Sequence, residues 1–266
     1  MTAEFPAAET CDTCATTDLR PWLERSDGLA VLQCSACGAG VVERLPPDLD
    51  VLYAGDYYST DESTGRGYSD YAYTAEHSVG WVGPLVELVQ PAGTSALDIG
   101  CADGLLLTRL PAGYARRVGI EVNPEMVARC RADGLEIIAT DVYDREALAP
   151  EQGRFDLITA MAVFEHVTGF REAVQVALDC PAPGGPLLFE VPQLVEPGDE
   201  GDSNHSWLTS SLEHLHYPTR RSLRRLFELL GTPLGGGELL IPGYGSTFVG
   251  LAGHDPDVVA AADDVW

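Results

Sequence analysis

The sequence contains no lysine, so all 16 of its basic residues are arginine, against 41 aspartate and glutamate residues. The formal net charge is −25. Proteins that bind nucleic acid need a cationic surface that neutralises phosphates, and anionic membranes attract basic surfaces in the same way. The one basic cluster, at 220–225, is better explained as the polar face of a helix. The charge therefore disfavours DNA, RNA and anionic membranes as partners.

The sequence also has no long apolar run and no basic, apolar leader. No run approaches the roughly 20 residues that span a bilayer, and the first residues do not resemble a secretory signal. We therefore expect a cytoplasmic protein. Its 266 residues, of which 45% are hydrophobic, are enough for one substantial core and a small extra module.

Four of the seven cysteines form two C-x2-C pairs with nineteen residues between them. Each pair allows two thiolates to converge from one knuckle, and two knuckles complete a tetrahedral zinc site. A redox pair is the alternative, but without a secretion signal the spacing favours zinc. Because four protein ligands leave no open position, the zinc is expected to be structural. The predicted ligands are Cys11, Cys14, Cys34 and Cys37.

The chain divides into three parts by composition. Residues 1–50 hold the paired cysteines and form the predicted zinc-binding module. Residues 51–79 hold six of the ten tyrosines, which suits a connector or lid that packs on another surface rather than a free linker. Residues 80–266 form the main domain.

Short apolar runs alternate with helical patterns through the main domain, which predicts a doubly wound α/β fold with a parallel sheet. A hairpin near the end of the chain is expected to make one edge antiparallel. Helices are predicted after the Asn123 cap, over 165–180, and from the Thr219 cap to Gly231. The apolar runs lie at 95–99, 117–122, 135–140, 156–161 and 186–191.

A glycine turn follows the first of these runs, in "ALDIGCADG". Gly100 and Gly104 are present, but Ala102 stands where a dinucleotide-binding turn needs its middle glycine, and a P-loop needs a lysine. Asp98 precedes the turn, where its negative charge would oppose a pyrophosphate and favour a cation. A ligand that carries an ammonium and a sulfonium group but no phosphate fits the negative charge of Asp98.

Two further acids end the next two strands. Glu121 lies seventeen residues after Gly104, where a carboxylate accepts hydrogen bonds from both ribose hydroxyls. Asp141 follows the third strand and is placed to meet an adenine amino group. An NAD(P)-binding domain is the nearest alternative, and the missing middle glycine counts against it.

The four segments "ALDIGCADG", "GIEVNP", "ATDVY" and "FDLITAMAVFEHV" resemble, in order and spacing, the motifs of class I S-adenosylmethionine (SAM)-dependent methyltransferases. The resemblance covers about 80–253. It implies a Rossmann-like seven-stranded sheet with the cofactor across the ends of the first strands. It places Asp98 near the methionine amino group, Glu121 on the ribose, and Asp141 with Val142 at the adenine. The full set of expected cofactor-binding residues is Asp98, Gly100, Cys101, Gly104, Glu121, Asp141 and Val142.

Titratable residues gather in the segment 204–219, which in this family lies over the substrate. It holds half of the six histidines, including His214 and His216, together with Glu213. A histidine can take the proton that a methyl acceptor loses. A second Glu-His pair, Glu165–His166, lies at the predicted start of a helix, where the glutamate is as readily explained by the helix dipole.

The Glu213–His214 pair also resembles part of the Tyr-x-Glu-His stretch of zinc-containing methyltransferases that add a C-methyl group to nucleotide-linked deoxysugars. Here Ser211 stands in place of the tyrosine, and the large third domain of those enzymes is not expected. The resemblance makes His214 the first choice of base, with His216 and His166 as reserves.

The sequence thus predicts a SAM-dependent methyltransferase with a structural zinc ion, acting on a small molecule such as a specialised metabolite or an activated sugar. Two alternatives stay open. One is a non-catalytic SAM-binding scaffold. The other is an RNA methyltransferase with a zinc module, which the net charge disfavours. The oligomeric state and the methylated atom are not predicted.

Overall fold

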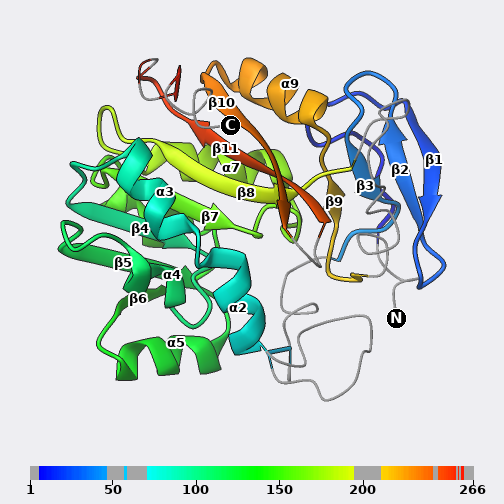
Figure 1. Cartoon of the computed structure of the whole chain (residues 1–266). Helices are drawn as coiled ribbons and strands as arrows, with labels where there is room; N and C mark the ends of the chain where they lie inside the picture. The colour runs from blue at the N-terminus through cyan, green and yellow to red at the C-terminus, as the bar shows by residue number, and fades with distance from the viewer. Residues whose placement is uncertain are drawn as a thin grey trace.

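A seven-stranded sheet runs through the centre of the computed structural model, with helices over both faces, and a smaller sheet lies at one end (Figure 1). The structure describes residues 6–46, 57–58, 71–194, 211–241, 245–255, 257 and 259–260. The strand order of the large sheet is β10-β11-β8-β7-β4-β5-β6. Its strands are β4 (Ser95–Ile99), β5 (Arg116–Glu121), β6 (Glu136–Ala139), β7 (Leu157–Met161), β8 (Leu187–Pro192), β10 (Leu234–Ile241) and β11 (Gly245–Ala252).

The predicted fold class is confirmed, with one correction at the edge of the sheet. Strands β6, β5, β4, β7 and β8 are parallel neighbours. The strand that runs against the others is β11, which lies between β8 and β10. Because β10 is antiparallel to β11 in turn, the edge strand itself runs parallel to the rest.

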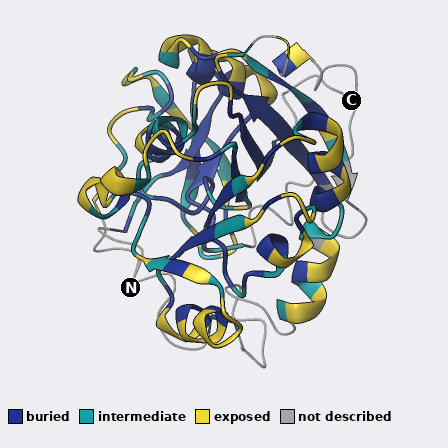
Figure 2. Ribbon diagram, turned by 90° about the vertical axis from the view of Figure 1, so that its left-hand side faces the viewer, coloured by how far each residue is buried: buried dark blue, intermediate teal, exposed yellow. Residues whose placement is uncertain are grey.

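The central strands are continuous hydrophobic runs because helices cover both faces of the sheet with apolar side chains. Helices α3 (Val82–Val89), α4 (Leu105–Arg109) and α5 (Pro124–Ala132) pack on one face. Helices α6 (Arg145–Leu148), α7 (Phe170–Asp179) and α9 (Arg220–Leu230) pack on the other. A parallel sheet covered on both faces buries successive side chains on either side. Figure 2 shows the strands dark and the outer faces of the helices exposed.

The helix termini follow the sequence signals. The Asn123 side chain accepts hydrogen bonds from the backbone N–H groups of Glu125 and Met126, at 3.0 and 3.1 Å, and so begins α5. Thr219 forms a capping box with Ser222 at the start of α9, and Gly231 ends that helix in the left-handed conformation.

The helix predicted over 165–180 is wrong at its start, because α7 begins only at Phe170. Residues 165–168 form a turn and a bend instead. The Glu165 carbonyl does not continue a helix: it accepts hydrogen bonds from the backbone N–H groups of Leu215 and His216, at 2.7 and 3.0 Å. A contact from a distant segment thus decides the local structure here.

The small sheet has the order β1-β2-β3-β9 and is antiparallel throughout. Strands β1 (Leu19–Glu24), β2 (Ala30–Cys34) and β3 (Gly40–Val42) belong to the N-terminal module. Strand β9 (His216–Tyr217) comes from the histidine-rich segment, and Figure 1 shows it beside β3. The module and this segment therefore fold as one sheet.

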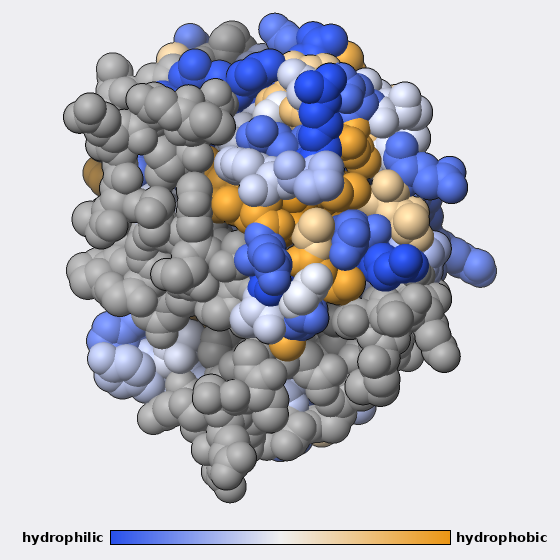
Figure 3. All heavy atoms as spheres, turned by 90° about the vertical axis from the view of Figure 1, so that its right-hand side faces the viewer, coloured by the Kyte–Doolittle hydropathy of each residue, from blue (hydrophilic) through white to orange (hydrophobic). Residues whose placement is uncertain are grey.

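The N-terminal module does not bury its apolar residues by itself. Its buried Val31 packs with Leu194 and Tyr217, and Val42 packs with Leu215, so residues of the larger part complete both clusters. Apolar surface remains at the centre of the face shown in Figure 3, between hydrophilic side chains. A module of this size needs such help or a metal, because its own core is too small.

The remaining described helices are α2 (Tyr71–Val79), which ends the tyrosine-rich connector, and the short 3-10 helix η2 (Ala149–Glu151). Residues 51–56 and 59–70 of that connector lie outside the described residues. No helix in the described part of the chain is long and apolar enough to cross a bilayer.

Candidate functional site

The four paired cysteines meet at one point of the N-terminal module. The Sγ atoms of Cys11 and Cys37 are 3.6 Å apart, as are those of Cys14 and Cys34. Four thiolates at Zn–S distances of about 2.3 Å in a tetrahedron lie about 3.8 Å from one another. All four ligand atoms lie within 4.8 Å, and three of the cysteines are buried. The cluster therefore fits the predicted zinc ion.

We expect the purified protein to contain about one zinc ion per chain, bound by these four thiolates. Metal analysis by plasma emission tests this. The Cys34→Ser variant should lose the zinc, while Cys180→Ser, which changes a buried cysteine outside the cluster, should keep it. Iron absorption bands, or a protein free of zinc after metal-replete expression, would contradict the assignment.

The glycine turn between β4 and α4 adopts the strained backbone that its sequence requires. Gly100 has φ +68°, and a Cβ atom there would lie 2.7 Å from a Val163 methyl group. Ala102 has φ +45°, a conformation that few residues other than glycine adopt. The alanine thus holds a backbone shape that glycine adopts more readily, and such strain is typical of ligand sites.

Glu121 is held rigidly at the end of β5. Its carboxylate accepts backbone hydrogen bonds from Ala102 at 2.9 Å and from Val122 and Asn123 at 2.9 and 2.7 Å. Burial raises the pKa of Glu121, and the hydrogen bonds from the three N–H donors lower it in part. Each carboxylate oxygen has two lone pairs, so the group can still accept bonds from a ligand.

Asp141 and Val142 follow β6. The Asp141 carboxylate accepts hydrogen bonds from the backbone N–H groups of Tyr143 and Asp144, at 2.8 and 3.0 Å, which fixes the turn. Val142 is buried, with 4% of its surface exposed. Both residues line the same cavity as Glu121.

That cavity, called here the central cavity, runs along the carboxyl ends of β6, β5, β4, β7 and β8. Of the residues predicted from sequence, Gly100, Glu121, Asp141, Val142 and His166 line it. Tyr57, Tyr58 and Tyr71 of the connector also line it, with neighbouring rings 4.9 and 4.8 Å apart. The position agrees with the rule that open α/β sheets bind ligands beyond the carboxyl ends of their strands.

Three other predicted cofactor residues, Asp98, Cys101 and Gly104, lie at or just before the glycine turn and do not line the cavity. Asp98 is buried and accepts a 2.7 Å hydrogen bond from the Thr159 hydroxyl. Burial, with the charge of Glu121 adding to it, raises the pKa of Asp98 to about 7. Cys101 packs against Gly119, and a Cβ atom at Gly104 would lie 2.3 Å from Leu135. In this structure the three residues shape the turn.

The two Glu-His pairs meet at the β7 side of the cavity. The rings of His166 and His214 are 5.0 Å apart and nearly perpendicular. The Glu165 carboxylate lies 3.4 Å from His166 Nε2. Burial lowers the pKa of His166, but the charge of Glu165, its hydrogen bond, and Glu213 outweigh burial, so the pKa is raised. Two imidazoles and a carboxylate within 4.8 Å also match the ligand types of a divalent metal.

His214 and His216 do not line the cavity themselves. The ring of His214 packs against the ring of His166. His216 lies in β9, where burial lowers the pKa of His216. Both histidines are buried, as is Glu213. The third histidine of the segment, His205, lies outside the described residues.

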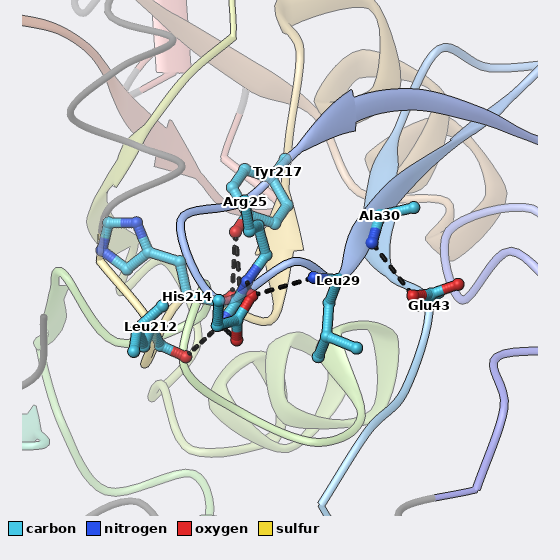
Figure 4. Close-up of polar contacts among 8 residues, drawn as sticks. Arg25, Leu29, Ala30, Glu43, Leu212, His214 and Tyr217 are labelled. Atoms are coloured by element: carbon cyan, nitrogen blue, oxygen red, sulfur yellow. Dashed lines mark hydrogen bonds and ion pairs between the residues drawn. The ribbon is translucent and has the colours of Figure 1, made fainter. Parts of the chain in front are cut away.

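Arg25 of the N-terminal module holds the histidine segment in place (Figure 4). Its guanidinium donates to the carbonyl oxygens of His214 and Leu212, at 2.6 and 2.8 Å, and to the Tyr217 hydroxyl at 3.2 Å. The Asp27 carboxylate, 3.0 Å away, balances the charge. The side chain is almost fully buried, so these contacts are shielded from water.

The first C-x2-C knuckle makes a further contact with the large sheet's helices. The Asp12 carboxylate accepts a 2.8 Å hydrogen bond from the backbone N–H of Arg171, in the first turn of α7. A carboxylate at a helix N-terminus is favoured by the helix dipole. The knuckle therefore braces α7 directly beyond Glu165 and His166.

Sequence reasoning missed Arg25 and Glu190. Glu190, near the end of β8, lines the cavity and is buried. A charged residue inside the apolar run 186–191 was a signal that could have been read, because a buried strand rarely carries a carboxylate without a function or a partner. No signal marked Arg25, whose partners are about 190 residues away in sequence.

A family model described as "Methyltransferase domain" matches residues 79–232, which is more than half of the chain. The chain belongs to this family. The matched region begins at the end of α2 and includes the central cavity's lining from β4 to β8.

Known proteins support the same fold. A ubiquinone biosynthesis O-methyltransferase of Methylococcus capsulatus is 33% identical over 103 residues, which is 37% of this chain and 43% of that protein. The chain thus matches less than half the length of this relative. The SAM-bound amino pentose methyltransferase CalS10 from Micromonospora echinaspora superposes with a TM-score of 0.51 at 18% identity, over 68% of this chain and 94% of that one. The plantazolicin methyltransferase BpumL gives a TM-score of 0.52 at 14% identity, over 69% and 85%.

Proposed function

We propose that the protein is a SAM-dependent methyltransferase that transfers the methyl group directly to a small molecule, with a histidine as base. The observation that carries the proposal is the central cavity, which brings Glu121, Asp141 and His166 together at the ends of three strands. Membership of the methyltransferase-domain family supports the reaction class.

The lining of the cavity fits SAM better than a dinucleotide. Glu121 would accept bonds from the ribose hydroxyls, and Asp141 with Val142 would meet the adenine. Apolar side chains of Ile99 and Ile120 line the same space. No arginine belongs to the described lining, and the chain has no lysine, so a pyrophosphate would find no cation there.

SAM, when bound, supplies an electrophilic methyl group on a sulfonium. The chain's own residues then have three tasks. Glu121 and Asp141 orient the cofactor, and the three tyrosines of the connector cover the cavity and limit water. The His166–His214 pair takes the proton that the acceptor loses, with Glu165 and Glu213 stabilising the resulting cation.

The positions of the two histidines indicate which of them lies nearer the acceptor. His214 is the base that resemblance to the sugar C-methyltransferases favours, and His166 is the one that lines the cavity. We propose that they act as one unit, with His166 nearest the acceptor. His216, in β9, is the remaining candidate for the base.

The acceptor is proposed to be a specialised metabolite or an activated sugar. The relatives named for ubiquinone biosynthesis and for an amino pentose act on small molecules by their names. The net charge of −25 argues against RNA as the substrate. The zinc ion is proposed to be structural, since the cavity and the cysteine cluster share no residue.

Replacing Glu121 with alanine should weaken binding of S-adenosylhomocysteine (SAH) by about 1.5–3 kcal/mol, which is roughly ten- to a hundredfold in affinity. The reason is that the ribose hydroxyls lose their charged acceptor. Calorimetric titration measures the change, and Glu125→Ala, an acid in the first turn of α5, serves as the control. SAH affinity unchanged in Glu121→Ala would remove Glu121 from the site. Binding of NADH in place of SAH would overturn the proposed function.

A further inference from the structure

The end of the central cavity at β7 and β8 is acidic. Glu121 and Asp141, which the proposed function assigns to the cofactor, lie at the ends of β5 and β6, on the far side of β4. The methyl acceptor is then left with the β7 and β8 side, where His166 and Glu190 line the cavity. Glu190 is 8% exposed, and the Thr247 hydroxyl donates to its Oε1.

Glu165 lies next to this end and strengthens its negative field. Its side chain is 1% exposed and its Oε1 lies 3.4 Å from His166 Nε2, while Oε2 accepts no hydrogen bond from the residues that the structure describes. Burial, and after it the charge of Glu165, raise the pKa of Glu190. A buried carboxylate with few donors is costly, and a cation brought between the two acids would relieve that cost.

The basic side chain at this end of the cavity is the His166 imidazole, and two buried carboxylates outnumber it. The described lining has no arginine, and the sequence has no lysine. Within the described residues, a phosphate group of an acceptor at this end of the cavity would lie near the carboxylates of Glu190 and Glu165, and such like-charge contacts are strongly unfavourable.

We propose that the methyl acceptor carries an ammonium group, which Glu190 binds, and that it is not a phosphate- or nucleotide-linked molecule. The inference rests on the proposed function and decides between its two classes of acceptor. It favours an amine-bearing metabolite or free amino sugar over a nucleotide-activated sugar. Glu190 recognises the cation, and the charge of Glu165, which acts on Glu190, adds to the negative field.

The probe for this field is sinefungin, the SAM analogue in which a CH–NH2 group replaces the S-methyl group. Its ammonium points where the methyl group would be transferred, whereas SAH has no group there. Sinefungin should bind about tenfold more tightly than SAH. The Glu190→Gln variant should lose about tenfold in sinefungin affinity and keep its SAH affinity within about twofold.

The matched control is Glu172→Gln, the same change of charge at an exposed position of α7. In a second titration, thymidine diphosphate is added to the SAH-loaded protein, and no binding is expected at millimolar concentration. Thymidine diphosphate binding, or equal sinefungin affinity in wild type and Glu190→Gln, would overturn the inference and leave the proposed function standing. Failure of SAH itself to bind would instead contradict the proposed function.

Discussion

Replacing His214 with alanine should lower turnover by about 10²- to 10⁴-fold, the usual worth of a general base, while SAM affinity stays nearly unchanged. The reason is the position of the side chain. His214 is buried against His166, whose ring lies 5.0 Å away, and it does not line the part of the cavity assigned to the cofactor. Turnover with labelled SAM and calorimetry with SAH measure the two effects separately.

The variants His166→Ala and His254→Ala complete this test. His166→Ala should cost as much as His214→Ala if the two act as a unit, and the double variant should cost little more. His254 is exposed, so its removal should change nothing. A base must be unprotonated, and the pKa of His166 is raised, so turnover should increase with pH through that value. Turnover near normal in both single variants would contradict the histidine base.

The same cluster could in principle act through a divalent metal, and one control separates the two cases. A base needs no metal, so incubation with a chelator too weak to remove the zinc proposed for the cysteine cluster should not change turnover. Loss of turnover that manganese or magnesium restores would show that Glu165, His166 and His214 hold a metal instead.

Replacing Arg25 with methionine should lower the free energy of unfolding by about 3 kcal/mol, as expected when one partner of a buried ion pair is removed. Methionine keeps an apolar stem of similar length, so the loss reports on the guanidinium. The Asp27 carboxylate and the carbonyl oxygens of Leu212 and His214 lose their donor. Turnover should also fall, because the histidine segment is no longer held.

Arg20→Met is the matched control for that experiment. Arg20 lies in the same module, and its ion pair with Asp18 is exposed, with 72% of the arginine side chain in solvent. Exposed pairs contribute about 0–1 kcal/mol. Urea unfolding compares the two variants, and turnover is measured where both remain folded. Equal stability of the two variants would show that Arg25 does not brace the segment.

Local signals in the sequence were enough to predict much of this fold. The parallel strands are apolar because both faces of the sheet are covered, and the caps at Asn123 and Thr219 use their own neighbours as partners. The cysteine spacing predicted the cluster of four thiols for the same reason, since each knuckle is a local structure. The residues proposed to bind the cofactor were predicted at strand ends from topology, and Gly100, Glu121 and Asp141 line one cavity.

Features that depend on contacts between residues far apart in the sequence could not be predicted from local signals. The segment 165–169 has helix-compatible residues, but its Glu165 carbonyl pairs with Leu215 and His216. Strand β9 has only two residues, so no periodicity marks it, and its partner β3 lies in another module. The prediction of an antiparallel edge strand was wrong for a similar reason. A hairpin pattern in the sequence does not show which of its two strands pairs with β8.

Methyl transfer from SAM to a small molecule is the activity proposed for this protein, and one labelling measurement tests it most directly. The purified protein is incubated with methyl-labelled SAM and a small-molecule extract of the source organism, and label is followed in small molecules, RNA and protein. We predict that label enters the small-molecule fraction, with one SAH formed for each methyl group transferred, and that His214→Ala abolishes most of this transfer. Label in RNA, or SAH binding without transfer to any small molecule, would contradict the account.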